Sequence, residues 1–360
     1  MPGNAVRYGI VGTGMMGLEH IQNILAIDGA EVTAIADPYA PSRRKALAVI
    51  GGSSTVAAFD DHLSLVDAGV CDAVVIASPN MTHVDVLLDL LGSDLHVLVE
   101  KPLCTTVEDC RAVIEAARRH RGVVAVGLEY RWMPSTTRFV EEIRSGTVGT
   151  LRMLSIREHR FPFLVKVHDW NRFNRNTGGT LVEKCCHFFD LMRLAIGADP
   201  VRIMASGGQD VNHLDEVYDG ESADILDNAF VIVDFENGVR ASLDLCMFAE
   251  ATQNAEELVA VGDRGKVEAL LPRGTVRIGR RGEHRSGGLE HHVVEDDRIQ
   301  YAGFHHGASY LEHLDFLGAI REGRAPAATL EDGLWSVAMG VAAHRSIDEG
   351  RVVAMDEVLA

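Results

Sequence analysis

A glycine-rich loop near the amino terminus constrains this chain more than any other feature of its sequence. The loop matches the pattern G-x-G-x-x-G with the residues Gly12, Thr13, Gly14, Met15, Met16 and Gly17. The apolar run Ala5–Val11 precedes it, helical spacing over Gly17–Ile27 follows it, and Asp37 ends the next apolar run. This order of strand, loop, helix, strand and acid predicts a dinucleotide-binding βαβ unit.

The loop residues suit the chemistry of a nucleotide. Gly12 permits the tight turn, Gly14 lets the backbone approach a pyrophosphate, and Gly17 lets helix and strand pack closely. The helix N-terminus adds N–H groups and a partial positive charge. A carboxylate at Asp37 accepts hydrogen bonds from ribose hydroxyls and repels a 2′-phosphate, so NAD is the expected cofactor. NADP stays open because Ser-Arg-Arg follows at 42–44. The alternative is a glycine-rich turn without a ligand, in which Asp37 only starts a turn.

Apolar runs alternate with helical spacing over the first third of the chain, which predicts a parallel sheet with helices on both faces. The expected strands are Ala5–Val11, Glu31–Ala36, Ala73–Ala77, His96–Val99 and Val123–Leu128. The expected helices are Gly17–Ile27, Ser42–Ile50, Val84–Leu91 and Thr106–His120. We therefore expect an α/β Rossmann domain over residues 1–128.

The pattern changes after about residue 130, where apolar and polar residues alternate and turn sequences recur. The expected hairpins join Ala229–Phe235 to Val239–Leu245 and Glu257–Val261 to Lys266–Leu271. The expected helices are a segment from Pro134 to Gly146, then Ser309–Arg321 and Leu334–Glu349. The segment Val276–Arg298 is expected to be a mobile loop or a pair of edge strands. These signals predict an α+β domain with a mainly antiparallel sheet over residues 129–360, whose last 30 or so residues pack back on the first domain.

Composition restricts the partners of the chain. Lys and Arg number 34 against 52 Asp and Glu, a formal net charge of −18, which argues against nucleic acid and anionic membrane surfaces as partners. No apolar run is long enough to span a membrane, and no secretory signal is evident at the start. The six cysteines form no C-x-x-C pair, so neither a structural metal nor a disulfide framework is expected. A cytoplasmic protein fits these features best.

Three further motifs follow in order: Ser78–His83, Glu100-Lys101-Pro102, and the segment Gly178–Asp190. Together with the glycine loop they resemble the glucose–fructose oxidoreductase, inositol dehydrogenase and rhizopine catabolism (Gfo/Idh/MocA) oxidoreductases over nearly the whole chain. The resemblance implies a Rossmann domain followed by an open, largely antiparallel sheet. It also implies nicotinamide-dependent oxidation or reduction of a hydroxyl on a sugar, sugar acid or cyclitol, and a homodimer or homotetramer.

The resemblance places the family's lysine at Lys101 and its downstream histidine at His187, while Glu183 stands where the family usually has Asp. The chemistry agrees, because oxidation of a hydroxyl-bearing carbon needs a base and a stabiliser of negative charge. An imidazole such as His187 titrates near neutral pH, and Lys101 can hold the substrate oxygen. Glu183 lies four residues before His187 and is expected to orient it or to bind a second hydroxyl. The alternative is a capping box, in which Thr180 and Glu183 close the helix start.

The remaining expected contacts fall into two groups. Cofactor contacts are expected from Ser78, Pro79, Asn80, His83, Glu100, Lys101, Trp170 and Arg172. Substrate contacts are expected from Tyr130, Arg131, His305 and His306. Domain packing is the alternative for Tyr130 and Arg131 and also for Trp170 and Arg172. The adjacent histidines lack the carboxylate spacing of a metal site, so no metal is expected.

Two other functions fit the same motifs. The first is redox-neutral cleavage of a glycoside or ether, in which a tightly bound NAD is reduced and reoxidised within one turnover. The second is a non-catalytic module that senses NAD. The presence of Lys101 and His187 argues against the sensing module. Redox-neutral cleavage stays open, and its signs would be cofactor that copurifies and product formed without net NADH.

Overall fold

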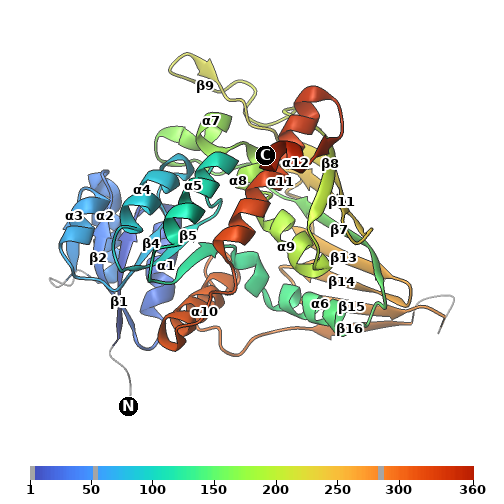
Figure 1. Ribbon diagram of the computed structural model, residues 1–360, viewed down its shortest axis with the longest axis horizontal. Helices are drawn as coiled ribbons and strands as arrows, with labels where there is room; N and C mark the ends of the chain where they lie inside the picture. The colour runs from blue at the N-terminus through green and yellow to red at the C-terminus, as the bar shows by residue number, and fades with distance from the viewer. Residues whose placement is uncertain (1–4, 52–55, 283–287) are drawn as a thin grey trace. The chain divides into compact units, whose positions relative to one another are not determined.

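The computed structural model describes residues 5–51, 56–282 and 288–360, and the chain divides into two compact units (Figure 1). The first unit comprises Met1–Glu129, Lys166–Trp170 and Asp297–Leu334. The second comprises Tyr130–Val165, Asn171–Asp296 and Trp335–Ala360. The segment near the carboxyl terminus that groups with the first unit is Asp297–Leu334, and Trp335–Ala360 groups with the second. The helix in Asp297–Leu334 packs on the helix that follows the glycine loop.

The first unit contains a parallel sheet, as the alternating pattern predicts. Within the described residues its six strands follow the order β3-β2-β1-β4-β5-β6. They are β1 (Val6–Val11), β2 (Ala30–Ala36), β3 (Ala57–Phe59), β4 (Ala73–Ile76), β5 (His96–Glu100) and β6 (Val124–Gly127). The order reverses next to β1, and ligands of open parallel sheets bind at such a point, beyond the carboxyl ends of the strands. The short edge strand β3 gives too little pattern to be predicted from sequence.

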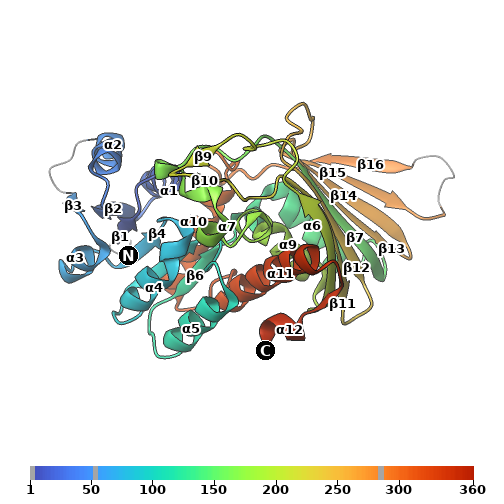
Figure 2. The same ribbon diagram turned by 90° about the horizontal axis from the view of Figure 1, so that it is seen from above.

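Helices cover both faces of this sheet, since right-handed crossovers between parallel strands place them there. Figure 2 shows α1 with α2 on one face and α3, α4 and α5 on the other. The helices are α1 (Met15–Leu25), α2 (Ala40–Ile50), α3 (His62–Asp67), α4 (His83–Leu90), α5 (Val107–Ala117) and α10 (Ala308–Glu322), with the 3-10 turn η1 (Asn80–Thr82). The late helix α10 packs on α1.

The second unit contains a mixed, mainly antiparallel sheet, as the hairpin signals predict. Within the described residues its nine strands follow the order β16-β15-β14-β13-β7-β12-β11-β8-β17, and only β12 with β7 is a parallel pair. The strands are β7 (Leu151–His159), β8 (Pro200–Gly208), β11 (Asn228–Phe235), β12 (Arg240–Cys246), β13 (Glu256–Gly262), β14 (Gly265–Leu271), β15 (Thr275–Arg280), β16 (Leu289–Val293) and β17 (Val353–Ala354). A separate hairpin joins β9 (Val217–Tyr218) to β10 (Glu221–Ser222). The segment Val276–Arg298 contains most of β15 and all of β16 at the sheet edge, and residues 283–287 lie outside the described ranges.

Helices of the second unit pack on one face of its sheet. Contacts join α9 to β7 and α6 to β14 and β15, and Figure 2 shows both helices on that face. The helices are α6 (Pro134–Arg144), α7 (Asn174–Thr177), α8 (Thr180–Glu183), α9 (Cys186–Ile196) and α12 (Asp356–Leu359), with the 3-10 segments η2 (Glu129–Trp132) and η3 (Val167–Arg172). The long helix α11 (Leu330–Glu349) begins in the first unit and continues into the second.

The opposite face of this sheet carries large apolar side chains. Phe230 is 67% exposed, Met153 59%, Met204 52% and Ile232 49%. They stand on β11, β7 and β8, at positions that alternate with buried residues. Separately, none of the helices within the described ranges has the length and apolar character that a membrane crossing requires.

Candidate active site

The glycine loop between β1 and α1 has the geometry of a phosphate cradle. Gly12 has a φ of +86°, and a Cβ added there would lie 2.5 Å from the Ser78 backbone nitrogen. A Cβ on Gly17 would lie 2.0 Å from the Gly12 carbonyl oxygen, so helix and strand require glycine there. At Gly14 an added Cβ would meet nothing within 4 Å. The open space therefore lies at the position where the backbone would approach a pyrophosphate, which fits a dinucleotide.

Asp37 follows β2 and holds the glycine loop. One carboxylate oxygen accepts hydrogen bonds from the Thr13 backbone N–H at 2.7 Å and its hydroxyl at 3.1 Å. The other accepts from the Tyr39 N–H at 2.8 Å. Arg43, a residue that keeps NADP open in the sequence, is engaged with the Asp60 carboxylate at 2.5 Å and the Asp37 carbonyl. Its pairing with an acid reduces the positive charge that it can offer to a 2′-phosphate.

The loop after β4 brings Ser78, Pro79 and Asn80 to the same edge of the sheet, because β4 neighbours β1. The Asn80 side-chain amide nitrogen is buried and has no hydrogen-bond partner among the described residues. A buried donor of this kind is suited to bind a ligand. His83 is fully buried, and its two ring nitrogens lie 2.8 Å from the Pro102 carbonyl oxygen and 3.0 Å from the Ser78 carbonyl oxygen. Burial lowers the pKa of His83, so the ring is neutral and donates to one of the two carbonyls. We propose that His83 packs between these two loops rather than contacting the cofactor directly.

Lys101 follows β5, the neighbour of β4, and is half-buried. Its peptide bond to Pro102 is cis. Glu100 is buried, and its two oxygens accept hydrogen bonds from His20 Nε2 at 2.9 Å and from the Lys101 backbone N–H at 3.0 Å. Burial opposes ionisation, but the hydrogen bond from His20 and the Lys101 charge outweigh it and hold the pKa of Glu100 below its usual range. One oxygen of Glu100 thus holds the Lys101 backbone, and the other connects the carboxylate to His20 of α1.

The other expected residues of the first unit lie apart from these loops in sequence. Trp170 belongs to the short segment Lys166–Trp170, in which His168 makes an edge contact with Tyr39 at 5.5 Å between ring centroids. His305 lies between two buried carboxylates, with Nε2 3.5 Å from Glu129 and Nδ1 3.9 Å from Glu19. His306 is exposed and has a positive φ of 55°. The structure therefore gives His305 acidic partners within its own unit.

In the second unit, Glu183 and His187 lie on two short helices rather than on one. The one-turn helix α8 ends at Glu183, and α9 starts at Cys186. The capping-box alternative is wrong, because the N-cap is Gly179 and no side chain caps the helix. The Thr180 hydroxyl donates a hydrogen bond to the Leu226 carbonyl oxygen at 2.7 Å. Glu183 is 5% exposed and His187 2% exposed.

The His187 ring stacks on Tyr130, with centroids 4.2 Å apart and planes 9° from parallel. The Tyr130 hydroxyl accepts a hydrogen bond from Lys184 Nζ at 2.7 Å and donates to Glu256 at 3.3 Å. Lys184 also pairs with Glu158 at 2.9 Å. Burial and the neighbouring Glu158 raise the pKa of Glu256. This buried cluster fixes the ring on which His187 lies.

Two arginines expected at the site are engaged in ion pairs of the second unit. Arg131 pairs with Asp190 of α9, its Nε 2.6 Å from the carboxylate, with both side chains buried. Arg172 is 2% exposed and pairs with Glu216 at 2.9 Å. Arg172 therefore belongs to a different unit from Trp170, although the two residues are close in sequence.

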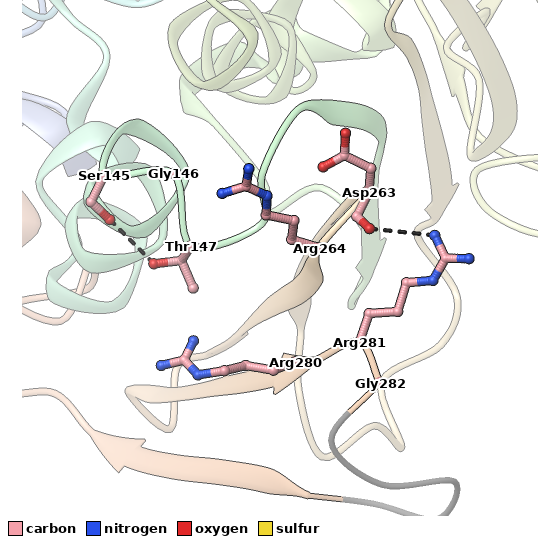
Figure 3. A pocket seen from close by; sticks show the side chains of 8 residues that line it. All are labelled: Ser145, Gly146, Thr147, Asp263, Arg264, Arg280, Arg281 and Gly282. Atoms are coloured by element: carbon pink, nitrogen blue, oxygen red, sulfur yellow. Dashed lines mark hydrogen bonds between the residues drawn. The ribbon is translucent and has the colours of Figure 1, made fainter.

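A surface hollow of the second unit lies elsewhere. Figure 3 shows that Arg264, Arg280 and Arg281 surround it, with Ser145, Gly146, Thr147, Asp263 and Gly282 completing its lining. Arg281 donates to the Asp263 carbonyl at 3.3 Å, and Arg280 pairs with Glu290 at the same distance. The lining contains no residue that the sequence marks for catalysis, so this hollow is not the candidate site.

The sequence interpretation missed the residues behind the site. Glu158 and Glu256 occupy inward-facing positions in the apolar alternations of β7 and β13, as Leu154 and Leu258 do. A charge at such a position is the signal that was available. His20, three residues after Gly17, gave no comparable signal because a helical histidine has many ordinary roles.

The comparisons with known proteins agree with this geometry. Two Gfo/Idh/MocA models match: the "NAD-binding Rossmann fold" of the oxidoreductase family over residues 6–128, and its "C-terminal alpha/beta domain" over residues 140–355. The myo-inositol 2-dehydrogenase of Thermotoga maritima is 27% identical over 360 residues, covering 98% of this chain and 100% of the relative. The scyllo-inositol 2-dehydrogenase (NAD(+)) of Bacillus subtilis is 23% identical and covers 98% and 96%.

Solved structures show the same fold. A probable dehydrogenase from Thermotoga maritima superposes with a TM-score of 0.78 at 25% identity, covering 98% of this chain and 100% of that chain. Levoglucosan dehydrogenase in complex with NADH and levoglucosan superposes with a TM-score of 0.86 at 20% identity, with the same coverage. The second likeness concerns the fold alone.

Proposed function

Because the chain belongs to the Gfo/Idh/MocA oxidoreductase family, we propose that it oxidises a hydroxyl of a sugar, sugar acid or cyclitol with NAD. One observation carries the proposal. Lys101 follows β5, and the open glycine loop follows β1 of the same parallel sheet. Because the carboxyl ends of parallel strands lie at one edge of a sheet, both lie at the edge where ligands bind. A lysine at this edge of a dinucleotide fold is suited to redox chemistry on a small polar substrate, because its ammonium group can donate to the substrate oxygen.

The residues divide the work by their chemistry. The glycine loop and the α1 N-terminus bind the pyrophosphate, and Asp37 binds the ribose. Lys101 holds the substrate oxygen and stabilises its developing negative charge. His187 takes the hydroxyl proton, and the stacked Tyr130 keeps the imidazole in one plane. NAD, when bound, would supply the acceptor for the hydride that leaves the hydroxyl-bearing carbon.

A panel of substrates tests the proposal. Purified protein is incubated with NAD and with inositols, aldoses, anhydrosugars or sugar acids, and NADH and ketone product are both quantified. We expect at least one class to give NADH and ketone in equal amounts. Product without NADH would instead support redox-neutral cleavage, and binding of NAD without any product would support the sensing module.

The Asp37→Asn variant is expected to lower the preference for NAD over NADP by about tenfold or more, measured as the ratio of kcat/KM values. Asn keeps an oxygen for the Thr13 N–H but removes the charge that repels a 2′-phosphate and strengthens hydrogen bonds from ribose. The matched control is Asp67→Asn on α3, an exposed acid of the same unit. An unchanged ratio in Asp37→Asn would contradict the ribose assignment.

We also propose that the chain is a homodimer or homotetramer that buries the exposed sheet face. The four apolar side chains on that face form an unusual surface for a monomer. Phe230→Asp places a charge at its most exposed position and should lower the mass measured by light scattering to that of a monomer. Phe304→Asp is the control, because Phe304 is 65% exposed in the other unit. A wild-type monomer at micromolar concentration would refute the proposal.

A further inference from the structure

A buried row of hydrogen-bonded side chains lies behind the Lys101 loop. His313 of α10 contacts His20 of α1, with Nε2 and Nδ1 2.8 Å apart. His20 Nε2 lies 2.9 Å from one oxygen of Glu100, whose other oxygen accepts the Lys101 backbone N–H at 3.0 Å. His313 is 0% exposed, His20 1% and Glu100 5%, so all three side chains are buried. All four residues belong to the first unit.

The direction of each hydrogen bond in this row follows from the groups at its two ends. The Lys101 amide can only donate, and the Glu100 carboxylate accepts from it and from His20 Nε2–H. A neutral His20 then offers a lone pair at Nδ1, which accepts from His313 Nε2–H. The remaining nitrogen, His313 Nδ1, carries no hydrogen in this arrangement.

The His313 end of this row supports the arrangement in which both histidines are neutral. His313 Nδ1 is buried and has no hydrogen-bond partner within the part of the chain that the structure describes. If His20 were an imidazolium, it would donate through both nitrogens, and His313 would have to bury an unpaired N–H at Nδ1. Burial also holds the pKa of His313 well below its usual value. Each donor therefore points toward Glu100.

The Lys101 loop is held from a second side by His83, whose ring contacts the Pro102 carbonyl at 2.8 Å. The loop is thus fixed at the amide before the Lys101 side chain and at the carbonyl after Pro102. The same row of hydrogen bonds connects this loop to α1, which starts at the glycine loop, and to α10. Small displacements of a reacting group cost about 10²-fold in rate, so such fixation matters for catalysis.

We propose that His20 and His313 are positioning residues, a neutral two-histidine relay that holds the Glu100 carboxylate and, through it, the backbone of Lys101 in the geometry for turnover. This inference rests on the proposed dehydrogenase function of Lys101. It adds two residues that touch neither cofactor nor substrate.

Substitutions separate positioning from packing. His20→Leu and His313→Leu keep an apolar filling but remove the donors, and we expect kcat to fall about 10- to 10²-fold with KM changed less than about threefold. His20→Gln and His313→Gln keep an N–H near the Nε2 position and should recover most of the activity. His120→Leu is the control, because it removes a histidine bonded to the Leu91 and Leu95 carbonyls of the same unit. Full kcat in both leucine variants, or equal loss in leucine and glutamine variants, would overturn the proposal.

A spectroscopic readout keeps the test independent of turnover. In protein labelled with ¹⁵N-histidine, the relay predicts that His20 and His313 are both neutral near pH 7 with the hydrogen on Nε2. An imidazolium at His20, or a hydrogen on Nδ1 of either ring, would contradict it even if a leucine variant failed to fold. If the wild-type protein reduces no NAD with any substrate, the proposed function fails, and the tautomers still decide whether the relay exists.

Discussion

Replacing Lys101 with Ala is expected to lower kcat by about 10²- to 10³-fold while the protein stays folded and still binds NAD. The expectation follows from the role of the ammonium group, which donates to an oxygen whose negative charge grows during the reaction. Removal of one such donor typically has this effect in a site that excludes water. NAD affinity should change little, because we propose that the glycine loop and Asp37 make most of the contacts with the nucleotide. Steady-state kinetics and cofactor titration measure the two quantities.

Lys45→Ala is the matched control for this variant. Lys45 is exposed on α2 of the same unit and makes no part of the candidate site. Its kcat should equal that of the wild type. If Lys101→Ala keeps full turnover with its true substrate, Lys101 is not catalytic, and the central assignment is lost.

Replacing His187 with Ala is expected to lower kcat by about 10²- to 10⁴-fold, the range for loss of a positioned general base. Imidazole added to this variant should restore part of the activity, because the substitution leaves a ring-sized space against Tyr130. The measurement is kcat as a function of imidazole concentration.

His159→Ala serves as the control for His187→Ala. His159 lies on β7 of the same unit and is hydrogen-bonded to Asp244 at 3.2 Å. It should keep wild-type kcat and show no response to imidazole. A His187→Ala variant with wild-type kcat would show that another group takes the proton.

Much of the fold was predictable because short sequence patterns mark many of the strands and turns in both sheets. The glycine loop marks the β1–α1 turn, and Glu236-Asn237-Gly238 marks the hairpin between β11 and β12. The break between α8 and α9 was not predictable, because the residues around Lys184 and Cys185 have no helix-breaking character. The capping-box pattern at Thr180 was misleading because Gly179 is the N-cap and Thr180 is already the first helical residue. The Thr180 hydroxyl donates a hydrogen bond to the distant Leu226 carbonyl.

The candidate site was predictable where one motif carries the chemistry, as at Gly12–Gly17 and Lys101. It was not predictable where partners come from distant parts of the chain. His20 and His313 are 293 residues apart in sequence, and Tyr130 and Glu256 are 126 apart. Such pairs depend on tertiary packing, which no local periodicity encodes. The same limit explains why the burial of Arg172 against Glu216 could not be foreseen.

Transfer of an isotope tests the central claim most directly. A substrate found in the panel is deuterated at the hydroxyl-bearing carbon, and the cofactor is recovered after turnover for mass spectrometry. The account predicts one deuterium per turnover in the reduced cofactor, together with one equivalent of ketone. Product that keeps or regains the deuterium, with no net NADH, would contradict oxidation as the overall reaction.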